Sequence, residues 1–317
     1  MKIVYLDQNH WIRLAQAYHR RSRDSQLVAA FEMLGEGVKN SAVALPLSAI
    51  HYMETARVTD QRRRARLGVV MWALSRGLTI ASYRSILTYE LETALAKRRS
   101  RVHPRPFTLV SQGVAHAFGM EVAPFRLRDE IRAALPEQLA QSLEEVGNTA
   151  MERALLTGEG PPGVEMLTFG MTKHNHRFQE HLRTLHPRLS QLSPNLWEDA
   201  LYAISIVDIL DPLNEVMAYH GLYTYDVASS REEFRSLLDD LPSRRVDIQL
   251  HRQVLRNPAL RPKKNDLEDW GALGPAAAHC DFLVCEKHFA SLLLRDGFKP
   301  RAAVLTDVRS LPEALDV

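Results

Sequence analysis

Cysteine is scarce in this chain, and its scarcity limits what can hold the fold together. The 317 residues include only two cysteines, Cys280 and Cys285. Residues five apart in a predicted strand point to opposite faces and lie too far apart for a disulfide bond. Because a chain without disulfides is typical of a reducing compartment, the sequence predicts a cytoplasmic protein.

Long hydrophobic runs are also absent. No stretch reaches the roughly 18 consecutive apolar residues of a membrane-crossing helix. The N-terminal residues lack the apolar core and the small-residue cleavage site of a signal peptide. We therefore expect no membrane partner.

No charge of one sign dominates the chain. Forty Lys and Arg residues against 38 Asp and Glu residues leave a net charge of +2, so the total charge does not argue for nucleic acid. The basic residues are nevertheless grouped into four clusters, at 20–23, 62–66, 97–101 and 261–264. Each cluster is compatible with a solvated helix end or with a phosphate-binding face.

Several common catalytic motifs are missing. The sequence has no glycine-rich phosphate loop, Walker-type motif or Gly-x-Ser-x-Gly elbow, which removes support for nucleoside-triphosphate and serine-hydrolase chemistry. Four histidines lie close together in sequence, but their spacing matches no zinc motif and no cysteine is near. They are His174, His176, His181 and His186. We interpret them as an ordinary polar helix face.

The pattern that is present predicts an α/β fold. A buried strand at 2–6 ends at Asp7, where a helical pattern starts. Further short strands are predicted at 42–45, 77–82, 281–285 and 302–305, whereas 84–250 is almost entirely helical in pattern. We expect a five-stranded parallel sheet with flanking helices, interrupted by a mostly helical insertion. The predicted division is 1–98 and 259–317 for the α/β part and 99–258 for the insertion.

Acidic residues follow the predicted strands or open the helices beside them. Asp7 follows the first strand, Glu286 follows the fourth, and Glu54 lies on the helix after the second. Asp266 and Asp269 share one face of the first turn of a late helix. Since parallel strands end at one edge of a sheet, these acids could meet there and hold Mg²⁺ or Mn²⁺ through carboxylate oxygens. The alternatives are a helix N-cap role for Asp7, a helix-dipole role for Asp266 and a surface position for Glu54.

Three stretches together resemble a PIN-like nuclease domain. They are Val4-Tyr5-Leu6-Asp7-Gln8-Asn9, the helix that carries Glu54, and the segment from Asn265-Asp266-Leu267-Glu268-Asp269 through Cys280-Asp281-Phe282-Leu283-Val284-Cys285-Glu286-Lys287-His288-Phe289. The resemblance implies a PIN-like parallel sheet and a metal-binding, catalytic set of acids. That set is Asp7, Glu54, Asp266 or Asp269, and Glu286. Asn9 matches a polar position that the family often keeps beside its first acid.

The chain departs from the family pattern in two ways. Glu286 stands where aspartate is usual and Val284 where threonine is usual, and the helical middle is far larger than a minimal PIN domain. Asp281 precedes its strand, at the opposite edge from the predicted site, and is therefore interpreted as structural.

The function that follows is a metal-dependent endoribonuclease that hydrolyses RNA phosphodiester bonds. Asn9, Lys263 and Lys264 are predicted to contact the substrate, although the two lysines fit a solvated surface equally well. The insertion is expected to select substrate, to shield the site, or to mediate contact with a second copy or a protein partner. Two alternatives stay open: a PIN-like RNA- or protein-binding module with little or no nuclease activity, and a metal-dependent hydrolase of small phosphate esters.

Overall fold

The predicted α/β architecture is confirmed by a computed structural model of the chain. It describes residues 1–121, 123, 125–160, 172–257 and 266–315, without the side chains of 172–179 and 266–269. Its central sheet has four parallel strands in the order β2-β1-β5-β6. These strands are β2 (Val43–Ala44), β1 (Lys2–Leu6), β5 (Phe282–Val284) and β6 (Ala303–Leu305).

The third predicted strand joins this sheet only in part. β3 (Leu78–Ile80) meets the segment after β2 through one parallel bridge, between Leu47 and Thr79. Its other edge pairs antiparallel with β4 (Val110–Gln112), a strand that the sequence pattern does not predict. The expected five-stranded parallel sheet is therefore a four-stranded sheet with a two-stranded antiparallel extension.

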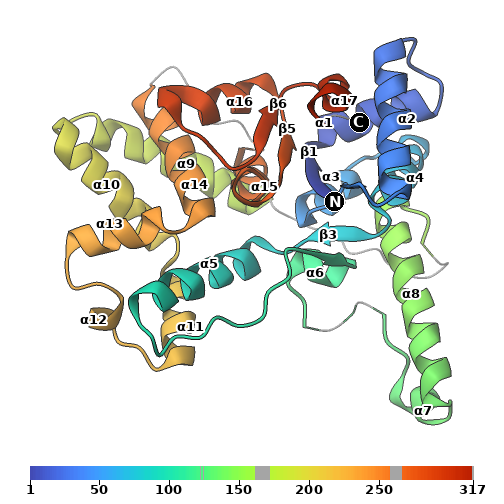
Figure 1. Cartoon of the computed structure of the whole chain (residues 1–317), viewed down its shortest axis with the longest axis horizontal. Helices are drawn as coiled ribbons and strands as arrows, with labels where there is room; N and C mark the ends of the chain where they lie inside the picture. The colour runs from blue at the N-terminus through green and yellow to red at the C-terminus, as the bar shows by residue number, and fades with distance from the viewer. Residues whose placement is uncertain (122, 124, 161–171, 258–265, 316–317) are drawn as a thin grey trace.

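Side chains of the two central strands alternate between two apolar cores. Tyr5 and Leu283 face one core, whereas Val4, Leu6 and Val284 face the other. This alternation follows from the two-residue period of a strand, and both faces are apolar because helices cover both. Figure 1 shows the paired strands β1 and β5 between these helical layers.

The helices before β4 follow β1, β2 and β3. They are α1 (Gln8–Tyr18), α2 (Ser25–Lys39), α3 (Ala49–Ala56), α4 (Gln61–Ser75) and α5 (Tyr83–Arg98). α1, α2 and α4 pack on one another and cover the core that contains Val4 and Leu6. α5 covers the other core.

The helices of the predicted insertion do not form a separate layer. They are α6 (Val114–Phe118), α7 (Asp129–Ala133), α8 (Glu137–Thr157), α9 (Thr172–Leu189), α10 (Pro194–Val207), α11 (Leu210–His220), α12 (Thr224–Val227), α13 (Arg231–Asp239) and α14 (Pro242–Arg256). α8 packs against α4 on one side of the sheet, while α14 packs against the late helices on the other.

The C-terminal part returns to the sheet. Its elements besides the strands are α15 (Asp266–His279), α16 (Lys287–Leu294), η1 (Arg295–Gly297), η2 (Val308–Ser310) and α17 (Leu311–Ala314). η2 and α17 pack on α2, which brings the end of the described chain beside the N-terminal helices. Within the described residues, no helix combines the length and apolar character needed to cross a membrane.

Candidate active site

The last residues of β1 and β5 lie side by side at one edge of the sheet. Leu6 pairs with Val284, and the backbone N–H of Asp7 donates to the carbonyl oxygen of Val284 at 2.9 Å. Asp7 and Glu286 therefore leave neighbouring strands at the same edge. The chain passes from β1 to β2 on one side and from β5 to β6 on the other, so this edge is also the point where the strand order reverses. Open α/β sheets bind their ligands at such points.

Asp7 has the helix-capping role that the sequence allowed, in addition to its place at the strand end. Its Oδ1 accepts a hydrogen bond from the backbone N–H of Gln8 at 2.7 Å, at the start of α1. Burial raises the pKa of Asp7 to about 6; the Gln8 N–H opposes the shift, and the charge of Glu286 adds to it. The two carboxylates are thus close enough to repel each other.

Glu286 is exposed, and its carboxylate is held by Asn9 of α1. The side-chain amide of Asn9 donates to Oε1 of Glu286 at 2.5 Å, across 277 residues of sequence. Asn9 thereby orients one carboxylate while Asp7, two residues earlier, supplies the other. The sequence predicts that Asn9 contacts the substrate, and this stays a prediction; in the structure its side chain contacts Glu286.

Glu54 is positioned by two residues of its own helix. The Nε2–H of His51 donates to the carbonyl oxygen of Leu6 at 2.8 Å, and Oγ1 of Thr55 accepts from the side-chain amide of Gln8 at 3.0 Å. These bonds fix α3 against the end of β1 and the start of α1. Glu54, which lies between the two anchors in sequence, is half-buried.

The hydroxyl of Tyr5 lies within electrostatic reach of Asp7 and Glu54. It hydrogen-bonds Oγ of Ser48 at 3.1 Å. Burial raises the pKa of Tyr5 strongly; the Ser48 hydrogen bond opposes the shift, and the charges of Asp7 and Glu54 add to it. Asp7 and Glu54 thus both act on Tyr5, whereas Glu286 acts on Asp7.

The other predicted site residues have no described side chains. Asp266 and Asp269 are in the first turn of α15, as expected, but only their backbone is described. Lys263 and Lys264 lie wholly outside the described ranges. Because α15 ends at His279, just before β5 begins, its first turn belongs at the end of the sheet where β5 finishes.

Two buried histidines lie near the site, and no sequence pattern singles out either. His51 stacks near Tyr5, with ring centroids 5.0 Å apart, and its Nδ1 accepts from the backbone N–H of Ser48 at 2.9 Å. Burial lowers the pKa of His51 to about 4, against the effect of its bond to Leu6, so the ring is neutral. Burial also lowers the pKa of His10, which lies on α1 within the electrostatic reach of Glu286. A lone histidine in a helix carries no local signal that predicts such surroundings.

The donor set of this edge suits a hard divalent cation. It offers carboxylate oxygens and one side-chain amide, and two of the carboxylates repel each other. The described residues contain no group of three or more His, Cys, Asp or Glu side chains placed to hold a metal ion. Asp7, Glu54 and Glu286 are all described, so these three alone do not form such a group. The side chains of Asp266 and Asp269 lie outside the described residues, and the predicted metal site stays a prediction.

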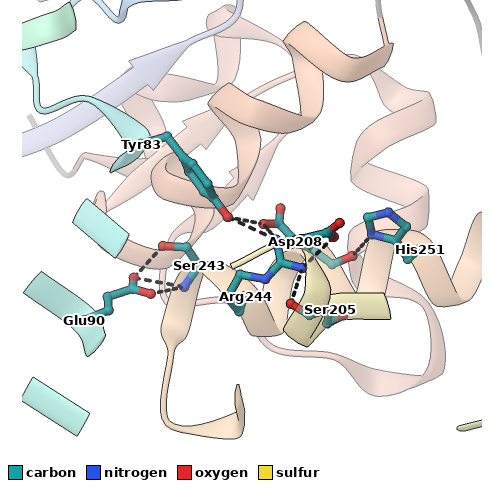
Figure 2. A network of polar contacts seen from close by, with 8 residues as sticks. Tyr83, Glu90, Ser205, Asp208, Ser243, Arg244 and His251 are labelled. Carbon is teal, nitrogen blue, oxygen red and sulfur yellow. Dashed lines mark hydrogen bonds and ion pairs between the residues drawn. The ribbon is translucent and has the colours of Figure 1, made fainter. Parts of the chain in front are cut away.

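A second polar centre lies next to α15, and the sequence pattern does not predict it. The guanidinium of Arg244 contacts the hydroxyl of Tyr83 at 3.1 Å, Oδ2 of Asp247 at 3.0 Å and Oδ2 of Asp208 at 3.1 Å (Figure 2). The side chain of Arg244 is only 5% exposed. Figure 2 shows the ring of Tyr83 reaching from α5 toward this arginine on α14. The cluster joins α5, α10 and α14.

This centre also sets the distance between α14 and α15. A Cβ at Gly274 of α15 would lie 2.8 Å from Oδ1 of Asp247, so the close approach requires glycine. One turn further along α14, the ring of His251 meets Trp270 edge-on, with centroids 4.9 Å apart. At the first turn of α14, Glu90 of α5 accepts hydrogen bonds from Ser243, as Figure 2 shows. Glu90 also contacts Nε2 of His279, the last residue of α15. These contacts fix the helix that carries Asp266 and Asp269.

Asp281 and two acids of α10 have structural partners. Oδ2 of Asp281 accepts from the backbone N–H of Ile3 at 2.8 Å, which agrees with the structural interpretation. Glu198 pairs with Arg252 and Arg256, and Asp199 pairs with Arg231 and Arg235. These ion pairs were not predictable from the local sequence.

Comparison of the chain with protein-family models, with curated proteins and with solved structures finds no match.

Proposed function

We propose that this protein is a metal-dependent endoribonuclease of the PIN-like type, with its reaction centre at the carboxyl edge of the parallel sheet. One observation carries the proposal. Asp7 and Glu286 leave the paired ends of β1 and β5 where the strand order reverses, and burial raises the pKa of Asp7 to about 6, with a smaller contribution from the charge of Glu286. A fold gains no stability from two adjacent carboxylates, so a bound cation is the simplest reason to keep them together.

Each residue has a part in this proposal. Asp7, Glu54, Glu286 and an acid of α15, either Asp266 or Asp269, would hold Mg²⁺ or Mn²⁺. Such an ion lowers the pKa of a bound water and stabilises a leaving oxygen in phosphodiester hydrolysis. Asn9 orients Glu286 through its amide, and His51 fixes α3 and with it the position of Glu54.

The test is cleavage of labelled single-stranded RNA by the purified protein with Mn²⁺, with Mg²⁺ or with EDTA. We expect cleavage in either metal and none in EDTA. Asp7→Asn keeps a helix-capping side chain but removes a charge, and it should reduce the rate by at least about a hundredfold.

Asp24→Asn is the matched control. Asp24 also caps a helix, accepting from the N–H of Leu27, but it pairs with Arg309 rather than facing a carboxylate. This variant should cleave at the wild-type rate. Equal loss in both variants, or cleavage that persists in EDTA, would contradict the proposal. RNA binding in EDTA without cleavage in any metal would instead favour the binding-module alternative.

A further inference from the structure

Two of the four basic clusters meet in one groove. A groove of about 480 Å³ between α1 and α4 is lined by Arg21 from the segment after α1 and by Arg62, Arg63 and Arg66 from the start of α4. His19 also lines it, and Asp60 is its one acidic residue among the described lining. The carboxylate of Asp60 is already engaged, because it accepts the backbone N–H of Arg63 as the N-cap of α4.

None of the four groove arginines has an acidic partner within the described chain. Arg21, Arg62 and Arg63 are exposed, and Arg66 is half-buried. In the cluster at 97–101, by contrast, two of the four basic residues are paired, Arg98 with Asp240 at 2.5 Å and Arg101 with Asp226 at 2.7 Å. A concave surface with several unpaired guanidinium groups attracts an anion.

The backbone is arranged to bring Arg21 to this surface. Arg20 has a left-handed conformation, with φ of 54°, which a non-glycine residue adopts at some cost. This turn folds the chain back so that the N–H of Arg21 donates to the carbonyl oxygen of Gln16 at 2.9 Å. Arg21 therefore lies beside the helix that lines the groove instead of continuing away from it.

The same face of α1 connects the groove to the acidic edge. Asn9, Ile12, Gln16 and His19 follow one another at spacings of three and four residues, so they form one stripe along the helix. Asn9 contacts Glu286, while Ile12, Gln16 and His19 line the groove. With a rise of about 1.5 Å per residue, the stripe runs about 15 Å from the acids to the end of the groove.

We propose that this groove binds the phosphate backbone of single-stranded RNA and leads it to the acidic edge. The choice of RNA rests on the proposed nuclease function. The choice of one strand rests on the shape, because axes of packed helices lie about 8–10 Å apart and a groove between them is too narrow for a duplex. The arginines would bind the phosphates through ionic contacts, without any covalent step.

The test is binding of a short fluorescent single-stranded RNA in EDTA, where no metal-dependent cleavage occurs. The variant Arg62→Gln, Arg63→Gln, Arg66→Gln should bind about tenfold more weakly at low salt. The slope of log Kd against log salt should fall by about 0.7 for each phosphate that the protein no longer neutralises. The control Arg128→Gln, Arg183→Gln, Arg188→Gln removes three exposed arginines elsewhere and should change neither quantity.

A groove variant that binds like the wild type, with the same salt slope, would overturn the proposal. Tighter binding of duplex than of single-stranded RNA would also overturn it. Cleavage is measured separately, so the two proposals can fail independently. If no variant cleaves RNA but the groove variant alone binds RNA more weakly, the groove stands and the nuclease proposal fails. If Asp7→Asn abolishes cleavage while the groove variant keeps full affinity, the nuclease proposal stands and the groove proposal fails.

Discussion

Asp7 serves two needs that conflict energetically. Its carboxylate caps α1, yet burial and the charge of Glu286 make its ionised form unfavourable and raise its pKa to about 6 from 3.8. The folded protein therefore binds a proton more tightly at this site than the unfolded chain does. Stability falls as pH rises from about 4 to about 6, and the loss persists at higher pH.

Asp7→Asn should therefore stabilise the metal-free protein at neutral and alkaline pH. Asparagine keeps the capping oxygen and removes the charge, so the gain should reach about 2 kcal/mol near pH 8 and vanish near pH 4. Urea unfolding in EDTA at both pH values measures it. A gain of equal size at both values would show that the charge of Asp7 is not the cause.

His51 has the opposite pH dependence. Its pKa in the folded protein is about 4, below the usual 6.5, because the buried ring must stay neutral. The unfolded chain therefore takes up the extra proton, and stability falls as pH drops from about 6.5 to about 4, by up to about 1.4 kcal/mol per unit.

His51→Leu should cost about 2–4 kcal/mol at pH 7, because it leaves the carbonyl oxygen of Leu6 and the N–H of Ser48 buried without their partner. The difference in free energy of unfolding between variant and wild type should narrow toward pH 4, because the wild type loses there the stability that depends on a neutral His51. Denaturant unfolding across this pH range measures both effects. A difference that stays constant with pH would mean that folding does not change the pKa of His51.

The acids of β1 and β5 could be predicted from sequence because a strand end is a local signal. A short buried run followed by an acid places Asp7 and Glu286 at the strand ends without any knowledge of the tertiary fold. His51 and Arg244 could not be found this way. Their partners lie 45 and 161 residues away, at Leu6 and Tyr83, and nothing in their own segments marks those contacts.

At the scale of elements, one arginine-rich run performs two different tasks. Arg63 faces the groove, whereas the guanidinium of Arg64 turns to the end of α8, donating to the carbonyl oxygen of Leu155 at 2.7 Å. Gly68, one turn further along α4, lies so close to α8 that a Cβ there would be 2.6 Å from the backbone of Leu156. Arg64 thus satisfies carbonyl groups that the helix end leaves open.

Arg64→Met should lower the free energy of unfolding by about 1–3 kcal/mol, since it leaves carbonyl groups of the α8 end without their partner. Arg63→Met, one residue away, should change it by less than about 0.5 kcal/mol, because that side chain is exposed and has no partner among the described residues. Denaturant unfolding of both variants measures the contrast. Equal effects would contradict the separate roles.

Strand β4 could not be predicted, for a reason that belongs to this scale. It has three residues, Val110-Ser111-Gln112, of which only the first is apolar, and Gly113 follows at once. β4 forms because its backbone groups complete β3, and that pairing depends on a partner 32 residues away. Short edge strands of this kind give no periodic signal, whereas the buried runs of β1 and β5 do.

At the scale of the whole molecule, the long insertion is built into the cores of the sheet. Leu155 and Leu156 of α8 share one core with β1, while residues of α10, α13 and α14 share the other with Tyr5 and Leu283. The helical character of 99–258 is predictable from its periodicity. Which face of the sheet each helix covers is not, because that depends on long-range packing.

The shared cores predict one cooperative unfolding transition for the sheet and the insertion. Trp11 lies in the core beside Val4, and Trp197 of α10 lies in the opposite core. In two variants that each retain one of these tryptophans, with the other three replaced by phenylalanine, the fluorescence midpoints in urea should coincide with each other and with that of helical circular dichroism. Arg244→Met breaks the buried contacts with Asp247 and Tyr83 and should shift both midpoints together, at a cost of about 3–5 kcal/mol. An earlier transition at Trp197 alone would mean that the insertion unfolds as a unit of its own, in which case the helix that carries Asp266 and Asp269 would lose its support before the sheet does.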